Sequence, residues 1–178
     1  MKTPPLILSL IFAVMAACAS AGCSSDPGKG YTLNSQFRKD VRTVAVPIWS
    51  RGRQVYRRNI EMQLTEAVIK QIELDTPYKV TSESRADTKL SGSIDAVAQQ
   101  VVTVNTDTGL PGEIEITLTV SFTWTDLRTG QELVRRENFR VTGAYLPTSP
   151  MSQDFFLGNE DTINRLAKRI VEQLEAEW

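Results

Sequence analysis

The chain has 178 residues with 20 basic and 21 acidic side chains, and therefore a formal net charge of −1. This near balance argues against a nucleic-acid-binding protein, which needs a concentrated basic surface. The chain has no histidine, which excludes a Ser-His-Asp triad, a Cys-His pair, an HExxH zinc site and acid–base catalysis by imidazole.

Motifs for phosphate binding and for nucleophilic catalysis are also missing. The sequence contains no GxGxxG, GxxxxGK[ST] or GxSxG segment, so we expect no cofactor, no metal and no catalytic residue. Carboxylates are abundant, but Glu113 and Glu115 alternate with apolar residues, and Glu172, Glu175 and Glu177 follow a predicted helix face. Charges placed in this way usually form solvated surface, so we expect a protein that is not an enzyme.

Residues 1–22 are predicted to form a lipoprotein signal peptide that ends before Cys23. Lys2 provides a positive start, Leu6–Ala17 is an apolar run of twelve residues, and three small residues precede the cysteine. Such a run is shorter than the about 20 residues that a membrane-spanning helix needs, but it suits a signal peptide. We expect lipidation at Cys23. Cys18 is a competing acceptor, and an ordinary secretory signal is the alternative.

The mature chain is predicted to contain a tether and one domain. Residues 23–40 are predicted to form a lipidated, flexible tether, because Ser24–Phe37 is rich in Ser, Gly, Pro and Asp. Residues 41–178 are then enough for a single domain with a real core. Both cysteines precede this domain, so no disulfide within the exported chain can stabilise it and its stability must come from packing.

The first half of the domain is predicted to form one strand and one helix. Apolar residues alternate over Val41–Trp49, and Pro47 places that part of the strand at a sheet edge or end because proline has no N–H. Ser50–Gln54 is predicted to turn the chain. Apolar residues at helical spacing then predict a helix over Tyr56–Leu74, which Pro77 should end.

The second half is predicted to form three strands, preceded by a short extended piece over Tyr78–Thr81. The first covers Lys89–Asn105, with a bulge or bend near Gln99-Gln100. The second, Glu113–Thr125, is the clearest, because all its even-numbered residues are apolar. The third covers Gln131–Tyr145, and the charged residues 135–137 interrupt its apolar pattern.

A last helix is predicted from about Asn159, because an apolar stripe runs along it. The stripe consists of Ile163, Leu166, Ala167, Ile170, Val171 and Leu174. Two amphipathic helices and a sheet with one apolar face predict an α+β two-layer sandwich. In it, both helices pack on one face of a mainly antiparallel four-stranded sheet, in the order β-α-β-β-β-α. The Thr-rich opposite face would remain open to solvent or a partner.

Several segments carry a resemblance to a known family. They read RTVAVPIW, RRNIEMQLTEAVIKQIELDTPYKV, RADTKLSGSI and ITLTVSFTWTDLRTGQEL, and are followed by the closing helix. Over nearly the whole mature chain they resemble the LptE-related lipopolysaccharide-assembly lipoproteins, especially the planctomycete-type branch. The resemblance implies a lipid-anchored protein on the periplasmic face of the outer membrane. It also implies two partners, an LptD-like β-barrel translocon that the protein binds or plugs, and lipopolysaccharide, which some members bind through basic loop residues.

Two segments are candidate contacts. Arg51, Arg53, Arg57 and Arg58 lie within eight residues, and guanidinium groups match the geometry of phosphate. We expect them to meet an anionic glycolipid or an acidic barrel wall; the alternative is a solvated cluster that balances nearby acids. The tip Leu110-Pro111 is a second candidate, because an exposed apolar tip can dock in a barrel, and its alternative is a plain hairpin loop.

Other periplasmic lipoproteins provide an alternative function. Activators of peptidoglycan synthesis and curli-type secretion components also begin with a VAV-P strand and an amphipathic helix, so the first half of the domain does not separate these classes. The long hairpin over Glu113–Tyr145, followed by a terminal helix, favours the lipopolysaccharide-assembly class.

Overall fold

The computed structural model describes residues 37–53, 55–147 and 155–175. The predicted signal peptide, both candidate lipidation sites Cys18 and Cys23, and most of the predicted tether lie outside the described residues. The end of that tether contacts the domain. Phe37 packs edge-on against Tyr78 with ring centroids 5.7 Å apart, and the backbone N–H of Arg38 donates to the Tyr78 hydroxyl at 2.9 Å.

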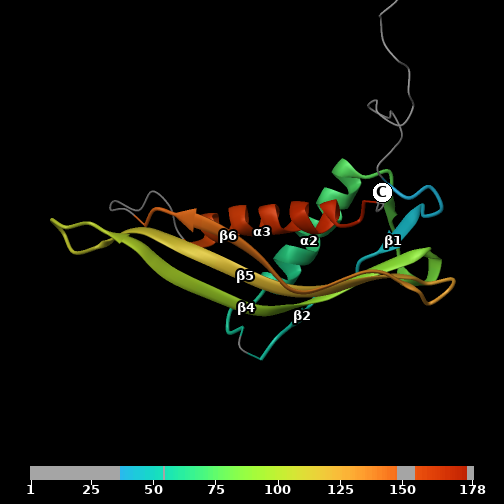
Figure 1. Ribbon diagram of the computed structural model, residues 1–178, viewed down its shortest axis with the longest axis horizontal. Helices are drawn as coiled ribbons and strands as arrows, with labels where there is room; N and C mark the ends of the chain where they lie inside the picture. Colours follow the sequence, from blue (N-terminus) through green and yellow to red (C-terminus); the bar gives the residue numbers. More distant parts are fainter. Residues whose placement is uncertain (1–36, 54, 148–154, 176–178) are drawn as a thin grey trace, which may run out of the picture. The chain divides into compact units, whose positions relative to one another are not determined.

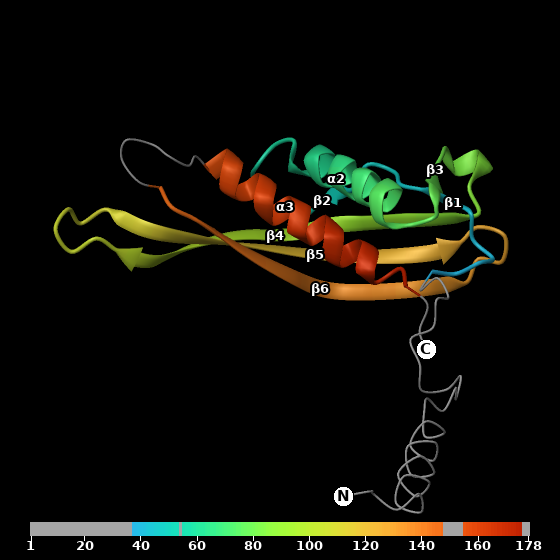
Figure 2. The ribbon, with the colours of Figure 1, turned by 90° about the horizontal axis from the view of Figure 1, so that it is seen from above.

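The domain consists of a mixed sheet with two helices on one face, as Figures 1 and 2 show from two directions. In chain order the elements are β1 (Thr43–Ala45), β2 (Ser50–Arg51), α2 (Ile60–Asp75), β3 (Lys79–Val80), a 3₁₀ turn (Glu83–Arg85), β4 (Thr88–Val104), β5 (Pro111–Asp126), β6 (Glu132–Tyr145) and α3 (Phe155–Glu172). The strand order is β3-β1-β4-β5-β6, and β2 pairs with β4 further along the same edge. The α+β class and the placement of both helices on one face agree with the sequence prediction.

The predicted four-stranded, mainly antiparallel sheet is wrong in two respects. The described sheet has six strands, and β1 pairs in parallel with both β3 and β4. The missed strands β2 and β3 have two residues each, which is too short for an alternating pattern. The parallel pairs arise because α2 carries the chain back to the end of the sheet where β1 began, which is the geometry of a crossover connection.

Local signals explain most of the element ends. β1 ends before Pro47, and the residues predicted to turn at Ser50 instead add the short strand β2. α2 begins at Ile60 rather than Tyr56, because Asn59 before it has a left-handed backbone with φ of 67°. It ends at Asp75, with Thr76 extended, as expected of the residue before a proline.

The core lies between the sheet and the helices. From β5 it contains Ile116, Leu118, Val120, Phe122 and Trp124, and from α3 the whole predicted apolar stripe. Close packing of α3 depends on Gly143 in β6, since a methyl group there would overlap the Thr162 hydroxyl.

Two strands of the sheet contain register shifts. The charged residues predicted to interrupt the pattern of β6 lie at one such shift, where Asn138 has φ of 53°. The bend predicted near Gln99-Gln100 is wrong, because β4 shifts register after Ile94 and after Val101 instead.

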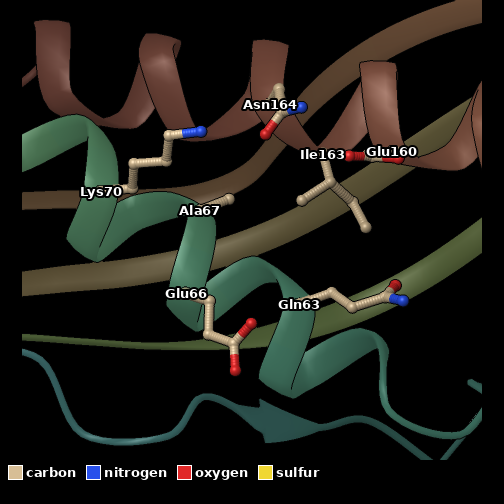
Figure 3. Close-up of a pocket in the computed structure, with 7 residues that line it drawn as sticks. All are labelled: Gln63, Glu66, Ala67, Lys70, Glu160, Ile163 and Asn164. Atoms are coloured by element: carbon tan, nitrogen blue, oxygen red, sulfur yellow. The ribbon is translucent and has the colours of Figure 1, made fainter.

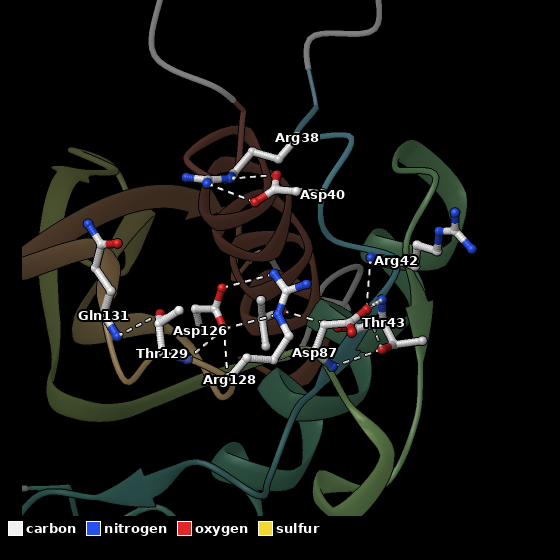
Figure 4. A network of polar contacts seen from close by, with 10 residues as sticks. Arg38, Asp40, Arg42, Thr43, Asp87, Asp126, Arg128, Thr129 and Gln131 are labelled. Carbon is white, nitrogen blue, oxygen red and sulfur yellow. Dashed lines mark hydrogen bonds and ion pairs between the residues drawn. The ribbon is translucent and has the colours of Figure 1, made fainter.

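A polar network closes one end of the sheet, which we call the base: β1, β3, the start of β4 and the β5–β6 turn (Figure 4). The Asp87 carboxylate accepts hydrogen bonds from the backbone N–H of Arg42 and of Thr43 at 3.1 and 3.0 Å, and these bonds lower its pKa. In the turn, the Arg128 guanidinium pairs with Asp126 at 3.0 Å. This pair and the Arg128 backbone N–H lower the pKa of Asp126 to about 2.

Candidate interaction surfaces

The cleft between α2 and α3 has polar walls (Figure 3). It encloses about 400 Å³ and is lined by Gln63, Glu66, Ala67, Lys70, Glu160, Ile163 and Asn164. Its amide, carboxylate and ammonium groups can form hydrogen bonds with a polar ligand. Within the described ranges, no group of three or more Cys, Asp or Glu could hold a metal ion.

A second hollow, of about 380 Å³, lies on the polar face of the sheet. Serine hydroxyls from β4 and β5 line it, and Arg135 of β6 borders it. The Asp95 carboxylate accepts hydrogen bonds from Ser93 at 2.8 Å and from Ser121 at 2.6 Å, while Arg135 pairs with Glu137 at 2.8 Å. Because these charged groups are largely satisfied within the protein, the hollow is a polar surface rather than an anion site.

The arginine segment, Arg51–Arg58, contains the four arginines predicted from the sequence, and all four are exposed. Arg57 and Arg58 precede α2 rather than lying in its first turn. Arg51 donates to the backbone carbonyl of Arg57 at 3.0 Å, and the Arg57 guanidinium donates to the Gln99 side chain at 3.2 Å. Glycine is required at position 52, because a Cβ there would lie 2.8 Å from the Ile94 carbonyl oxygen on β4.

Three of the four arginines of this segment, Arg51, Arg53 and Arg58, take part in no recorded ion pair among the described residues. Tyr56, in the same segment, is 90% exposed. The sequence analysis missed Tyr56 as a surface residue, because it counted this tyrosine as the first residue of the helix. The segment therefore presents cations and one aromatic ring to solvent.

The distal hairpin, residues 101–112, is the second candidate that the structure brings out. Figures 1 and 2 show the ends of β4 and β5 running beyond the start of α3. Leu110, predicted as a tip residue, is 54% exposed, and Val101, Val102 and Val104 are 47%, 53% and 56% exposed. The sequence analysis counted the three valines as ordinary strand residues. The available signal was the VVTV run itself, in which apolar residues occupy both faces of the strand.

The turn of this hairpin is fixed by hydrogen bonds. The backbone N–H of Asn105 donates to the Leu110 carbonyl at 2.9 Å, and the N–H of Gly109 donates to the Asn105 carbonyl at 2.8 Å. The Asn105 side chain accepts from the N–H of Asp107 at 2.9 Å and of Thr108 at 3.1 Å. Gly109 has φ of 68°, which glycine adopts without a steric cost. The exposed apolar side chains are therefore held on a defined turn.

Together, these features define a two-layer sandwich domain that exposes a basic segment and an apolar hairpin. The sequence model of the LptE family, described as lipopolysaccharide-assembly, matches residues 41–177. The chain belongs to this family of non-enzymatic lipoproteins, whose members associate with components of lipopolysaccharide transport. No curated protein sequence matches the chain. None of the described helices is both long and apolar enough to cross a membrane.

Solved structures share the fold at low sequence identity. The solution structure of uncharacterized lipoprotein B from Nitrosomonas europaea has a TM-score of 0.52 at 14% identity, covering 83% of this chain and 91% of that one. The hypothetical protein CT253 from Chlamydia trachomatis has a TM-score of 0.52 at 9% identity, covering 75% and 98%. Protein XCC0632 from Xanthomonas campestris has a TM-score of 0.51 at 14% identity, covering 74% and 81%. At these identities the likeness concerns the fold alone.

Proposed function

We propose that this protein is an outer-membrane lipoprotein, acylated at Cys23, that assists lipopolysaccharide assembly by binding a large β-barrel translocon of the LptD kind. The observation that carries the proposal is the family match over residues 41–177. The described surface supports a binding role, because it offers an exposed basic segment and an exposed apolar hairpin. Such exposed groups on a small domain mark sites of association.

The arginine segment is the proposed contact for the anionic part of lipopolysaccharide or for an acidic wall of the barrel. Guanidinium groups recognise phosphate with paired hydrogen bonds, and Arg53 and Arg58 have no ion-pair partner among the described residues. The exposed Tyr56 lies within the same segment, and its ring adds an apolar surface beside these charges.

The barrel partner is tested by affinity purification of the full chain from detergent-solubilised outer membranes. We expect one large β-barrel to co-purify, and depletion of the protein to lower the amount of lipopolysaccharide at the cell surface. Recovery of a cell-wall synthase instead of a barrel would contradict the proposal and favour the alternative lipoprotein class.

The anchor is tested with two cysteine variants that differ only in position. Cys23→Ala should give an unacylated protein that is released from membranes, and mass spectrometry of the mature N-terminus checks this. Cys18→Ala is the matched control and should remain acylated and membrane-bound. The opposite pattern would move the lipidation site to Cys18.

The arginine segment is tested by replacing Arg51, Arg53, Arg57 and Arg58 with alanine and measuring binding to purified lipopolysaccharide. We expect weakening of about tenfold or more, because several charge-assisted contacts are lost together. A variant with alanine at Arg42, Arg85, Arg140 and Lys168, four exposed basic residues elsewhere on the domain, removes the same number of charges and is the control for net charge. Equal binding by both variants would remove the segment from the proposal.

A further inference from the structure

The distal hairpin exposes several large apolar side chains to solvent. Val101, Val102, Val104 and Leu110 are each about half exposed, and the helices that cover the rest of β4 and β5 do not reach them (Figure 2). Their turn is held by five hydrogen bonds among the described residues. A rigid tip loses little conformational entropy when it binds, so this apolar surface is prepared for docking.

The charge of the hairpin restricts what can cover it. None of the 20 Lys and Arg residues lies in the 38 positions between Lys89 and Arg128. The same stretch contains Asp107 in the turn and Glu113 and Glu115 on β5. An acidic element without cations is repelled by phosphates and by anionic lipid headgroups, and it is attracted to a surface that carries basic side chains.

The hairpin also lies far from the point at which the chain enters the domain. Phe37, the first described residue, forms a bridge with Glu175 just beyond the end of α3. That end of α3 and the strand β1 lie opposite the hairpin (Figure 2). β4 has 17 residues, which at about 3.3 Å each separates its two ends by roughly 50 Å. A lipid anchor that precedes Phe37 in the chain therefore enters at the end of the domain far from the hairpin.

We propose that the distal hairpin docks on an apolar protein surface bordered by lysine or arginine side chains. This inference rests on the proposed function in one respect only, since the partner surface is taken to belong to the β-barrel. The arginine segment and the hairpin then contact different surfaces, because one is basic and the other acidic.

The docking surface is tested by introducing charge at the tip. In the full chain, Val102→Asp combined with Leu110→Asp should leave thermal unfolding unchanged and lower barrel co-purification about tenfold or more. Leu74→Asp is the matched control, because Leu74 is 67% exposed on α2, and it should bind as the wild type does. Equal recovery of the barrel with the tip variant would overturn the inference and leave the proposed function standing.

The basic character of the partner surface has its own test. Asp107→Lys combined with Glu113→Lys should weaken co-purification more than Asp107→Asn combined with Glu113→Gln, and the wild-type complex should weaken as salt is raised. Tighter binding by the lysine variant would show an acidic partner surface and overturn the inference.

A photo-crosslinking residue at position 110 separates the inference from the proposed function. In cells it should form an adduct with a peptide of a β-barrel that contains apolar residues beside Lys or Arg. An adduct with such a peptide from another protein would keep the docking surface and overturn the barrel as partner. Absence of any adduct, or tip-dependent binding of the purified protein to phosphatidylcholine vesicles with or without phosphatidylglycerol, would overturn the docking surface.

Discussion

The two ends of the hairpin formed by β4 and β5 differ in what covers them, although the strands are continuous. Near the base, Leu90 and Trp124 pair across the strands and both are fully buried. At the distal end, Val101 pairs with Ile114, and Val101 is exposed. The residue types are similar, so burial here is decided by whether a helix lies above the strand rather than by the strand sequence.

The base is also fixed by polar contacts that the distal end lacks. Asp87 ties the start of β4 to β1 through the backbone N–H of Arg42 and of Thr43, and Asp126 holds the β5–β6 turn (Figure 4). At the distal end, the recorded side-chain hydrogen bonds of residues 101–112 all lie within the turn itself, beside the β4–β5 pairing. The comparison indicates that the base provides stability and that the distal hairpin is free to serve binding.

The largest expected effect comes from one core residue and its exposed counterpart. Leu118→Ala should lower the free energy of unfolding by about 2–5 kcal/mol, because Leu118 is fully buried and its removal leaves a cavity. Leu110→Ala at the distal tip should change it by less than about 0.5 kcal/mol, as exposed substitutions do. Urea unfolding of both variants checks this, and similar losses would mean that the tip is part of the folding core.

A smaller effect is expected where α3 packs on β6. Gly143→Ala should destabilise the domain by about 1–3 kcal/mol, because the added methyl group overlaps Thr162 and the helix must shift. Gly130→Ala is a useful contrast. No described atom lies within 4 Å of a Cβ placed on Gly130, so a loss of stability there would come from its φ of 75°, which is unfavourable for a residue with a side chain. If Gly143→Ala destabilises a Thr162→Ala background, which lacks the overlapping hydroxyl, as much as it destabilises the wild type, crowding against that hydroxyl is not the cause.

A single hydrogen bond beneath α2 should contribute less. The Thr65 hydroxyl accepts the backbone N–H of Trp49 at 3.1 Å, and both residues are buried. Thr65→Val keeps the shape but leaves that N–H without a partner, so we expect a loss of about 1 kcal/mol. Thr65→Ser retains the hydroxyl and should recover part of it, as denaturant unfolding can measure. A larger loss in Thr65→Ser than in Thr65→Val would indicate that the methyl group matters instead of the hydroxyl.

The smallest effect is confined to acid pH. Hydrogen bonds from Arg128 lower the pKa of Asp126 from 3.8 to about 2, so the folded state binds this proton less readily than the unfolded state does. The resulting stabilisation is fully present above the ordinary pKa and is lost as pH falls from about 4 to about 2. In Asp126→Asn, thermal unfolding midpoints should depend less steeply on pH in that window. An unchanged slope would contradict the assignment.

Much of the fold could be predicted from the sequence, and the predictions that were wrong have local causes. The apolar stripe from Ile163 to Leu174 and the alternation over Ile114–Trp124 fix which faces are buried, because these patterns are long. The strands β2 and β3 were missed or taken for turn and extended chain, because two residues contain no pattern. The register shifts in β4 depend on contacts with β5, which no single strand encodes.

The interaction surfaces were only partly predictable. The four arginines of the segment Arg51–Arg58 were found by their spacing. That Arg51, Arg53 and Arg58 form no recorded ion pair among the described residues required the structure. Leu110 was found as a tip residue from the flanking glycines. Val101, Val102 and Val104 were not, because an exposed valine and a buried one have the same appearance in a strand sequence.

By itself, the sequence determined the class of the domain, the two amphipathic helices and the absence of histidine chemistry, because composition and long periodic patterns do not depend on distant contacts. Only the tertiary structure decided that β1 pairs in parallel, that the helices stop short of the distal hairpin, and that four apolar side chains there remain exposed. The exposure of a side chain depends on how separate helices and strands pack against one another, and this packing is a property of the whole chain rather than of any one segment.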